Sequence, residues 1–318
     1  MTNRFKYKTA EELRSHAKDL GIELPWSEDF TLLFESFKMG SQEVPNRFVV
    51  HPMEGADAKP DGSPGDLTYR RYQRFANGGS GLIWVEATSV CQDGRSNAAQ
   101  LYLHKNNRSE FSKLVDQIHL NSNLPAGSPG EVKTVIQLTH SGRYSKPEGN
   151  PAPKVACRDQ RYDSQFEHII ELSDDELKRI RDAHVDAAIL AEKAGFNGVD
   201  IKICHGYLFH EILFARNRTG SEYGGIELEK RIRILDETLK GIQETTRTNL
   251  VVRMNVFDGL EGGIEVLEAQ EIISHLDTHG VSLWSLTAGI PYVNPWIGRP
   301  FDLPAKSLNP PPEHPLVG

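Results

Sequence analysis

GFNGVDIKICHGYLFHEILFARNRTGSEYGG, residues 195–225, is the stretch that decides the fold of this chain. It contains a short run with glycines before it, Val199 to Ile201, which is typical of a buried strand. Lys202, His205 and Tyr207 follow at once, so polar and reactive side chains gather where that strand ends. In repeating β/α folds the loops at the strand ends face a common cavity, which makes these three residues candidates for catalysis. The alternative is that they only form a packed, hydrogen-bonded corner.

Around this stretch the chain alternates short apolar runs with amphipathic segments. Strands are predicted at 47–52, 81–87, 132–138, 197–201, 249–254 and 281–287, and helices at 66–77, 109–122, 173–194, 226–246 and 265–279. This alternation predicts parallel strands with both faces covered, and the two solutions are a TIM-type (β/α) barrel and an open doubly wound sheet. No GxGxxG follows the first strand, and polar residues follow several different strands. The α/β fold predicted is therefore the barrel.

The two ends of the chain lie outside this repeat. Residues 1–44 are predicted to form an N-terminal extension with a short helix from Thr9 to Leu20, and residues 45–318 to form the barrel. Six βα units are visible, the chain becomes proline-rich after Ile290, and it ends in PPPEHPLVG. We therefore expect strands seven and eight of the barrel to be missing from this chain. The loop at 139–172, here called the cover loop, is expected to lie over the strand ends.

Composition bounds the class of protein and its partners. The 318 residues are 38% hydrophobic and 25% charged, as in a globular chain with a sizeable core. A net charge of -8 argues against nucleic acid or an anionic membrane as the main partner. No apolar run approaches the ~18 residues that a membrane span needs, and the N-terminus has no apolar leader. A cytoplasmic protein is expected.

The cysteines indicate neither disulfides nor a metal site. Cys91, Cys157 and Cys204 are far apart and odd in number, which fits a reducing compartment. Cys204, His205 and His210 lie close in sequence, but their spacing is not that of a usual zinc site. No metal is predicted.

Several further side chains follow the predicted strands. Gln137, in IQLTHSGR, can offer one acceptor and two donors to a ligand, and Arg253, in VVRMNVFDG, places a permanent cation at the same end of the fold. Pro52 and Met53 follow the first strand and Ala87 ends the second. Together these residues describe contacts around one flat site, where the small Ala87 would let a planar ligand approach, although it could equally fill the core.

Five segments of the chain form an ordered set of motifs: NRFVVHPMEG, GLIWVEATSV, QLTHSGR, the segment 195–225 and VVRMNVFDG. Together they resemble the old yellow enzyme family, the FMN-dependent NADH:flavin oxidoreductases. The resemblance covers roughly residues 44–318, and the HGYL to YGG part of segment 195–225 is its most specific part.

The resemblance implies FMN as cofactor and NAD(P)H as electron donor. Gln137 would pair with the polar edge of the isoalloxazine, Arg253 would lie near N1/O2, where charge accumulates on reduction, and Pro52, Met53 and Ala87 would line the ring. In the family a His/His or His/Asn pair grips the carbonyl oxygen of an enone, flavin N5 delivers hydride, and a tyrosine protonates the α-carbon. His205 and Tyr207 match the second member of that pair and the tyrosine.

The chain departs from the family pattern at three places. Lys202 stands where the first member of the pair is normally histidine, and an ammonium there would favour an acidic or more electron-rich acceptor. Glu54 stands where a small Thr or Cys often lies, and an anion there would lower the flavin potential if it points inward. In the family, strands seven and eight bind the FMN phosphate, so the phosphate anchor is expected to be missing here.

The predicted function is an FMN-dependent reductase of activated C=C bonds of the enone or dienoyl type that acts on a small molecule. A homo-oligomer is one option for its assembly. Two alternatives remain open from the sequence. Lys202 at the end of barrel strand four could form a Schiff base, as in aldol-type lyases. The chain could also be a truncated, non-catalytic fragment.

Overall fold

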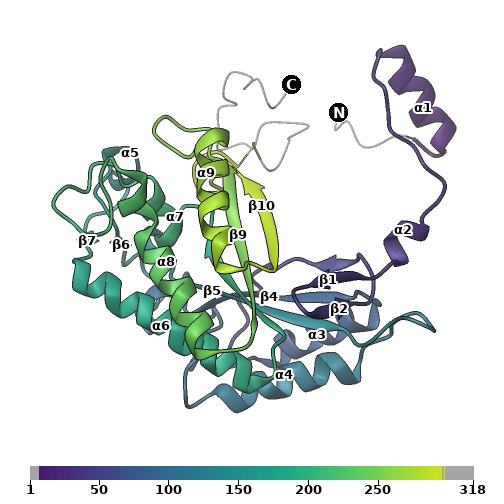
Figure 1. Cartoon of the computed structure of the whole chain (residues 1–318), viewed down its shortest axis with the longest axis horizontal. Coiled ribbons are helices and arrows are strands. Elements are labelled where there is room, and N and C mark those ends of the chain that lie inside the picture. Colours follow the sequence, from purple (N-terminus) through teal and green to yellow (C-terminus); the bar gives the residue numbers. More distant parts are fainter. Residues whose placement is uncertain (1–6, 296, 298–318) are drawn as a thin grey trace.

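A six-stranded parallel sheet forms the centre of the computed structural model, which describes residues 7–295 and 297 (Figure 1). Its strand order is β10-β9-β8-β5-β4-β3, so each strand pairs with its neighbour in the βα repeat. The bounds are β3 Val49–Val50, β4 Leu82–Ser89, β5 Lys133–Thr139, β8 Gly198–Ile203, β9 Asn249–Phe257 and β10 Leu283–Ala288. The six predicted strands are confirmed, although the first is much shorter than the predicted 47–52. The result is a parallel (β/α) half-barrel.

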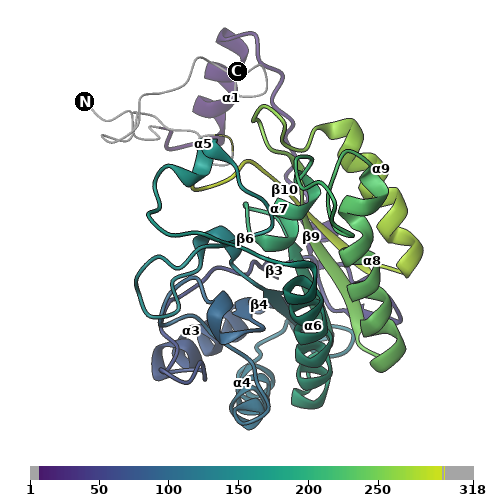
Figure 2. The ribbon, with the colours of Figure 1, turned by 90° about the vertical axis from the view of Figure 1, so that its left-hand side faces the viewer.

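Five helices connect these strands and line up along the outer side of the sheet (Figure 2). They are α3 Asp66–Asn77, α4 Arg108–Leu120, α6 Asp174–Ala194, α8 Leu228–Thr245 and α9 Val266–Leu276, with a 3-10 turn, η3 Asp277–His279, after α9. The predicted helices are confirmed within two residues at each end, except that α9 ends three residues early and the 3-10 turn η3 occupies those three residues. Helix α6 begins at the predicted capping box, in which Ser173 and Glu176 bond each other's backbone N–H, and it ends at Gly195 with φ 97°.

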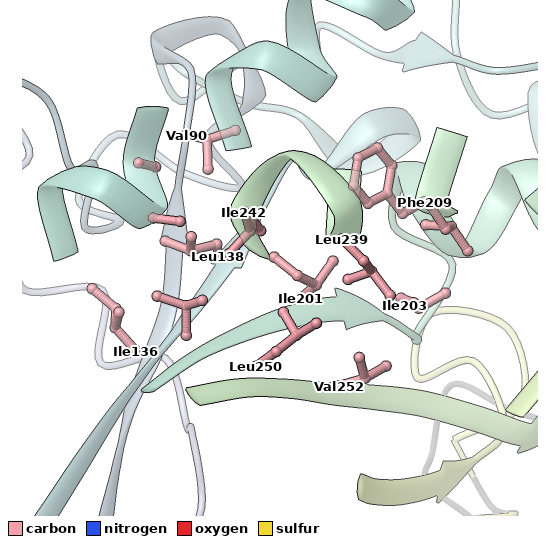
Figure 3. Packing of buried hydrophobic residues seen from close by; sticks show 14 of the residues in the cluster. Val90, Ile136, Leu138, Ile201, Ile203, Phe209, Leu239, Ile242, Leu250 and Val252 are labelled. Carbon is pink, nitrogen blue, oxygen red and sulfur yellow. The ribbon is translucent and has the colours of Figure 1, made fainter. Parts of the chain in front are cut away.

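The period-two alternation of the strands divides their side chains between two environments. One set packs on the helices in the main core, which Figure 3 shows between the sheet and α8, with Ile136, Leu138, Ile201, Ile203 and Val252 among its members. The alternate set faces the barrel interior. Its lower members are apolar (Leu82, Trp84, Val135 and Val251), whereas its upper members are polar (Glu86, Gln137, Asp200, Lys202 and Arg253). The inward-facing side chains therefore change from apolar to polar within two residues along the strands, and this upper, polar end is the functional end of the sheet.

An antiparallel hairpin that the sequence analysis did not predict closes the lower end of the interior. Its strands are β1 Phe37–Met39 and β2 Gln42–Val44. Met39 and Val44 are fully buried and pack with the lower, apolar members of the inner face. Gly40 makes the turn with φ 58°, and a Cβ there would lie 2.2 Å from the Asn249 side chain. Part of the predicted N-terminal extension therefore packs against the sheet.

The rest of the N-terminal segment contains two short helices. The predicted helix is confirmed as α1 Ala10–Asp19, with Thr9 Oγ1 accepting from the N–H of Glu12 as its N-cap. Figure 1 shows α1 apart from the sheet, and α2 Thr31–Phe34 lies between α1 and the hairpin.

The cover loop contains structure of its own. It holds a 3-10 turn, η2 Gly142–Tyr144, a short parallel ladder of β6 Lys154–Val155 with β7 Ile170–Glu171, and α5 Gln160–Asp163. Two further short elements lie at strand ends: η1 Gln92–Gly94 follows β4, and α7 Leu208–Leu213 follows β8.

Two further expectations from the sequence concern the C-terminal segment and membrane-spanning helices. The C-terminal PPPEHPLVG, after which strands seven and eight were expected to be missing, lies outside the described residues. Among the helices in the described part of the chain, none is both long and apolar enough to cross a bilayer.

Candidate functional site

The upper, polar part of the inner face is built in register across three neighbouring strands. Gln137 of β5 stands beside Asp200 of β8, and Lys202 of β8 stands beside Arg253 of β9. Gln137 Nε2 donates to Asp200 Oδ2 at 2.6 Å, and Trp84 Nε1 donates to the same oxygen at 3.0 Å. These contacts place the Gln137 amide with its nitrogen toward Asp200, so its oxygen is the atom left to accept a hydrogen bond.

Asp200 is a site residue that the sequence analysis did not identify, since it read Val199–Ile201 only as strand. The carboxyl group is fully buried, and this burial raises its pKa from the ordinary 3.8 to about 7, although the Gln137 hydrogen bond and the Arg253 charge oppose the rise. Its Oδ1 and the Nε of Arg253 are both buried without a hydrogen bond among the described residues. A ligand with donors and acceptors along one edge would satisfy such atoms.

Lys202 and Tyr207 are brought into direct contact at the end of β8. The Lys202 ammonium lies 3.7 Å from the centroid of the Tyr207 ring, a close cation–π contact. Both side chains are nearly buried, with 6% and 3% of their surface exposed. Tyr207 is also the N-cap residue of α7, so the turn after β8 fixes its backbone.

Glu54 points inward to the same place. Its Oε1 accepts from the Tyr207 hydroxyl at 3.1 Å and lies 3.8 Å from Lys202 Nζ, and its Oε2 accepts from Ser96 Oγ at 2.7 Å. The sequence analysis left the direction of Glu54 open. The three side chains therefore bring together a cation, a phenol and a carboxylate, joined by one hydrogen bond, one ion pair and one cation–π contact.

The buried carboxylate of Glu86, on β4, holds the backbone of the segment that follows β3. Gly55 N donates to Glu86 Oε2 at 2.6 Å, and Arg71 of α3 pairs with Glu86 and with Asp57. A Cβ at position 55 would collide with the Arg71 guanidinium, at 1.9 Å. Glycine next to Glu54 thus lets the chain pass close enough to β4 to turn Glu54 inward.

Two further tyrosines lie beside Tyr207. The rings of Tyr144, in the cover loop, and Tyr292, after β10, stack with centroids 3.8 Å apart. The hydroxyls of Tyr207 and Tyr292 are 3.4 Å apart, and the rings of Tyr144 and Tyr207 are 6.3 Å apart. Aromatic surface therefore borders the Lys202–Tyr207 pair, which suits a planar apolar substrate.

His205 occupies a strained position in the turn between β8 and α7. Its φ is 64°, in the left-handed region that few non-glycine residues adopt. The turn is braced on both sides: His205 N donates to Asn255 Oδ1 at 3.3 Å, and Gly206 N donates to His210 Nδ1 at 2.9 Å. Burial, and then the charges of Lys202 and Arg253, lower the His205 pKa to about 2, so the ring is neutral at physiological pH.

The remaining predicted residues lie at the ends of β3 and β4. Pro52 is buried, Met53 is 72% exposed, and both precede Glu54 in the chain. Ala87 is buried near the end of β4, where its carbonyl accepts from Gln100 Nε2 at 2.9 Å. The structure therefore joins Lys202, His205 and Tyr207 at one place, links Gln137 to Asp200 beside Arg253, and leaves Met53 open to solvent.

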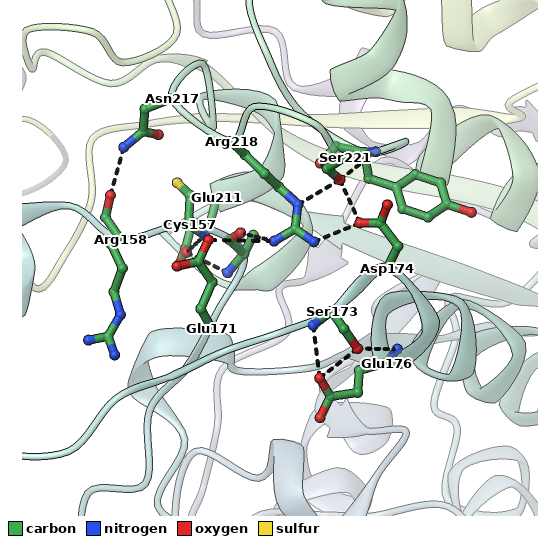
Figure 4. Close-up of polar contacts among 12 residues, drawn as sticks. Cys157, Arg158, Glu171, Ser173, Asp174, Glu176, Glu211, Asn217, Arg218 and Ser221 are labelled. Atoms are coloured by element: carbon green, nitrogen blue, oxygen red, sulfur yellow. Dashed lines mark hydrogen bonds and ion pairs between the residues drawn. The ribbon is translucent and has the colours of Figure 1, made fainter.

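The cover loop is fastened to α7 and α6 by buried charged groups (Figure 4). Glu211 of α7 accepts from the backbone N–H of Ala156 at 2.7 Å and of Cys157 at 3.2 Å, and from Arg143 Nη2 at 3.1 Å. Arg218 donates to the Ala156 carbonyl and to Asp174 of α6, the latter at 2.7 Å. These contacts hold the loop beside the site.

No group of three or more His, Cys, Asp and Glu side chains suited to a metal ion occurs in the described part of the chain. The three cysteines are all free and buried.

The model of the NADH:flavin oxidoreductase / NADH oxidase family matches residues 32–295. The chain is 31% identical over 263 residues to NADPH dehydrogenase from Bacillus pumilus, a match that covers 81% of this chain and 74% of the relative. Among solved structures, it resembles a 2-naphthoyl-CoA reductase complex with a TM-score of 0.74 and 24% identity, over 82% of this chain and 41% of that one. It also resembles the old yellow enzyme homologue from Zymomonas mobilis, with a TM-score of 0.66 and 25% identity, over 81% and 74% of the two chains.

Proposed function

Because the chain belongs to the NADH:flavin oxidoreductase / NADH oxidase family, we propose that it reduces an activated C=C bond whose activating group carries or develops negative charge. The family makes it an NAD(P)H:flavin oxidoreductase with FMN as cofactor and NAD(P)H as electron donor. The observation that carries the proposal is the Lys202 ammonium packed on the Tyr207 ring at the end of β8. A fixed cation and a proton donor there can act on the two ends of one conjugated acceptor.

The polar edge formed by Gln137, Asp200 and Arg253 suits the flavin ring. The Gln137 amide oxygen would accept from a flavin N–H, and the buried Nε of Arg253, which has no partner among the described residues, would donate to a carbonyl oxygen or ring nitrogen. Pro52, Met53 and Ala87 would line the ring. FMN held at this edge would supply the two-electron chemistry between NAD(P)H and the acceptor.

Lys202 and His205 would bind the activating oxygen of the acceptor. The ammonium stabilises negative charge there, which counts for more in a site shielded from water than in solution. His205 is held neutral, so it can donate one N–H bond without adding a second charge. A carboxylate or an enolising carbonyl group is therefore the expected activating group.

Tyr207 would protonate the acceptor carbon. Its hydroxyl lies within 3.1 Å of Glu54, and burial, then the Glu54 charge, hold the pKa of this phenol well above its ordinary value. The tyrosine is therefore protonated when the acceptor binds, as a general acid must be.

A panel of alkenes tests this proposal. Purified protein loaded with FMN should oxidise NADPH and reduce α,β-unsaturated acids or ketones. Lys202→Met should lower kcat/KM for the alkene by about 10²–10³-fold, the size typical for loss of one charge-stabilising group, while reduction of the flavin by NADPH continues.

Lys193→Met is the matched control, because Lys193 is exposed at the end of α6. Alkene reduction that does not depend on Lys202 would overturn the assignment of the acceptor site. Trapping of a carbonyl substrate on Lys202 by borohydride would instead indicate imine chemistry, which a flavin reductase does not need.

A further inference from the structure

We propose that Glu54 is a positioning residue that returns a proton from solvent to Tyr207 after each turnover, an inference that rests on the alkene reduction proposed above. Tyr207 is 3% exposed, so water cannot readily restore its proton directly. A proton donor that acts once per turnover needs a path by which it is recharged.

Glu54 has the contacts that such a path requires. Its Oε1 accepts from the Tyr207 hydroxyl at 3.1 Å, and its Oε2 accepts from Ser96 Oγ at 2.7 Å. Both carboxylate oxygens are therefore oriented, one toward the phenol and one toward the segment after η1. The Glu54 side chain is 23% exposed, whereas that of Lys202 is 6% exposed. Of these two groups, Glu54 has the greater access to water. Tyr292, whose hydroxyl also faces that of Tyr207, is 54% exposed, but burial raises the pKa of this phenol, which makes it a poorer proton carrier than a carboxylate.

The charged and titratable groups around Glu54 come from several elements. Lys202 Nζ of β8 lies 3.8 Å from Oε1, and Tyr292, after β10, faces the Tyr207 hydroxyl at 3.4 Å. Glu86 of β4 is close enough for the Glu54 charge to contribute to its raised pKa, of which burial is the main cause. Lys202 thus balances the negative charge of Glu54 while Glu54 is ionised.

The proton steps balance without any redox partner beyond the flavin. The Tyr207 O–H bond breaks as a C–H bond forms on the acceptor, which leaves a phenolate beside Glu54. That phenolate is strongly basic, because burial and then the Glu54 charge raise the Tyr207 pKa. A proton taken from solvent at the exposed side of Glu54 moves along the 3.1 Å contact to the phenolate, and the Glu54 carboxylate is restored. The net change is one proton taken from solvent per alkene reduced.

The test separates the two half-reactions of the FMN-loaded protein. With Glu54→Gln, changes in reduction of the flavin by NADPH and in its reoxidation by ferricyanide, which forms no C–H bond, measure what the loss of the Glu54 charge does to the flavin itself. Steady-state turnover with the alkene should fall by about 10–100-fold beyond those changes. Glu54→Asp should recover part of the rate, and formate or acetate should accelerate Glu54→Ala. Glu131→Gln, which removes a carboxylate that is 81% exposed, is the matched control.

Three outcomes would overturn the relay. One is alkene turnover in Glu54→Gln as fast as in wild type. Another is a loss of equal size with ferricyanide, which would mean that Glu54 only supports the local structure. The third is that formate and acetate fail to accelerate alkene turnover by Glu54→Ala. Failure of the proposed function gives a different pattern, because the wild-type protein would then reduce no alkene at all.

Discussion

At the scale of single residues, the site depends on alternate side chains of β5, β8 and β9 changing from apolar to polar. Val135 and Val251 face the lower core, and the next inward residues are Gln137 and Arg253. Asp200 lies between them and binds the Trp84 indole as well as Gln137. A fully buried acid that accepts from both Gln137 and Trp84 on one oxygen is suited to hold Gln137 in one orientation rather than to stabilise the fold.

The pH dependence of stability should report the burial of Asp200. Its pKa is raised from 3.8 to about 7 in the folded protein, so folding favours the protonated form. The contribution to stability is complete below about pH 4 and is lost as the pH rises through about 7, on the order of 4 kcal/mol in total. Asp200→Asn in the flavin-free protein should flatten the pH dependence of the free energy of unfolding between about pH 4 and pH 7, as measured by urea denaturation.

Asp116→Asn is the control for this measurement, because Asp116 is exposed on α4. If the free energy of unfolding changes equally steeply with pH in Asp200→Asn and in wild type, Asp200 does not titrate in this range.

The sequence identified the residues that follow strand ends but not those that reach the site from elsewhere. Lys202, His205 and Tyr207 follow one recognisable strand, so their meeting could be predicted. Glu54 reaches Tyr207 across 153 positions of the chain, and its direction depends on Glu86, Arg71 and the close approach at Gly55. Asp200 was missed because a single acid between two β-branched residues is also what a strand with one polar face would show.

At the scale of elements, the cover loop is held by one buried carboxylate. Glu211→Gln keeps the acceptor for Ala156 and Cys157 but removes the charge that faces Arg143. Hydrogen bonds to charged groups contribute about 1.5–3 kcal/mol, so local opening of residues 154–171 should become about 10–150-fold more frequent. Hydrogen exchange of the β6 and β7 backbone amides would measure this local opening.

Glu167→Gln makes the same chemical change at an exposed position of the cover loop and should leave this exchange unchanged. Unaltered exchange in Glu211→Gln would show that the loop is held mainly by its other contacts, such as those of Arg218.

The β1–β2 hairpin is the second element with a measurable role. Met39 is fully buried among Leu82, Trp84 and Val251, so Met39→Ala should cost about 2–5 kcal/mol of unfolding free energy. Met53→Ala, at a position 72% exposed, should change it by less than about 0.5 kcal/mol in the flavin-free protein. A cost below about 1 kcal/mol for Met39→Ala in urea denaturation would contradict the role of the hairpin as part of the core.

The larger elements could be predicted from the sequence because their apolar patterns are long. The five helices between the strands of the central sheet (α3, α4, α6, α8 and α9), and most of those strands, have long apolar patterns. The hairpin was missed because each strand has only three residues, so its alternation was too short to recognise. Helix α7 was missed because all six of its residues are buried, which removes the amphipathic pattern.

At the scale of the whole molecule, bound FMN should contact side chains of three adjacent strands, β5, β8 and β9, and stabilise these strands together. FMN bound to the Gln137–Arg253 edge would stabilise the folded chain by about 2.7 kcal/mol at a concentration one hundred times its Kd. Arg253→Met should weaken FMN binding by about 10–150-fold, measured by the visible spectrum and by the shift in thermal midpoint. Riboflavin, which lacks the phosphate, should give a shift that depends on Arg253 in the same way.

Arg247→Met is the matched control, because Arg247 is exposed at the opposite end of β9. If Arg253→Met binds flavin as tightly as wild type, the edge formed by Gln137, Asp200 and Arg253 is not the flavin site.

The hairpin that closes the lower end of the interior also bears on how the chain is synthesised. Met39 and Val44 leave the ribosome early, but two of their core partners, Val251 and Leu283, belong to β9 and β10, close to the end of the described chain. At cellular elongation rates the apolar hairpin therefore waits for roughly 10 to 50 seconds before this small core can close. During that time it is a natural binding site for chaperones, and a change that slows translation between β5 and β9 should lower the yield of folded protein without altering the stability of the molecules that do fold.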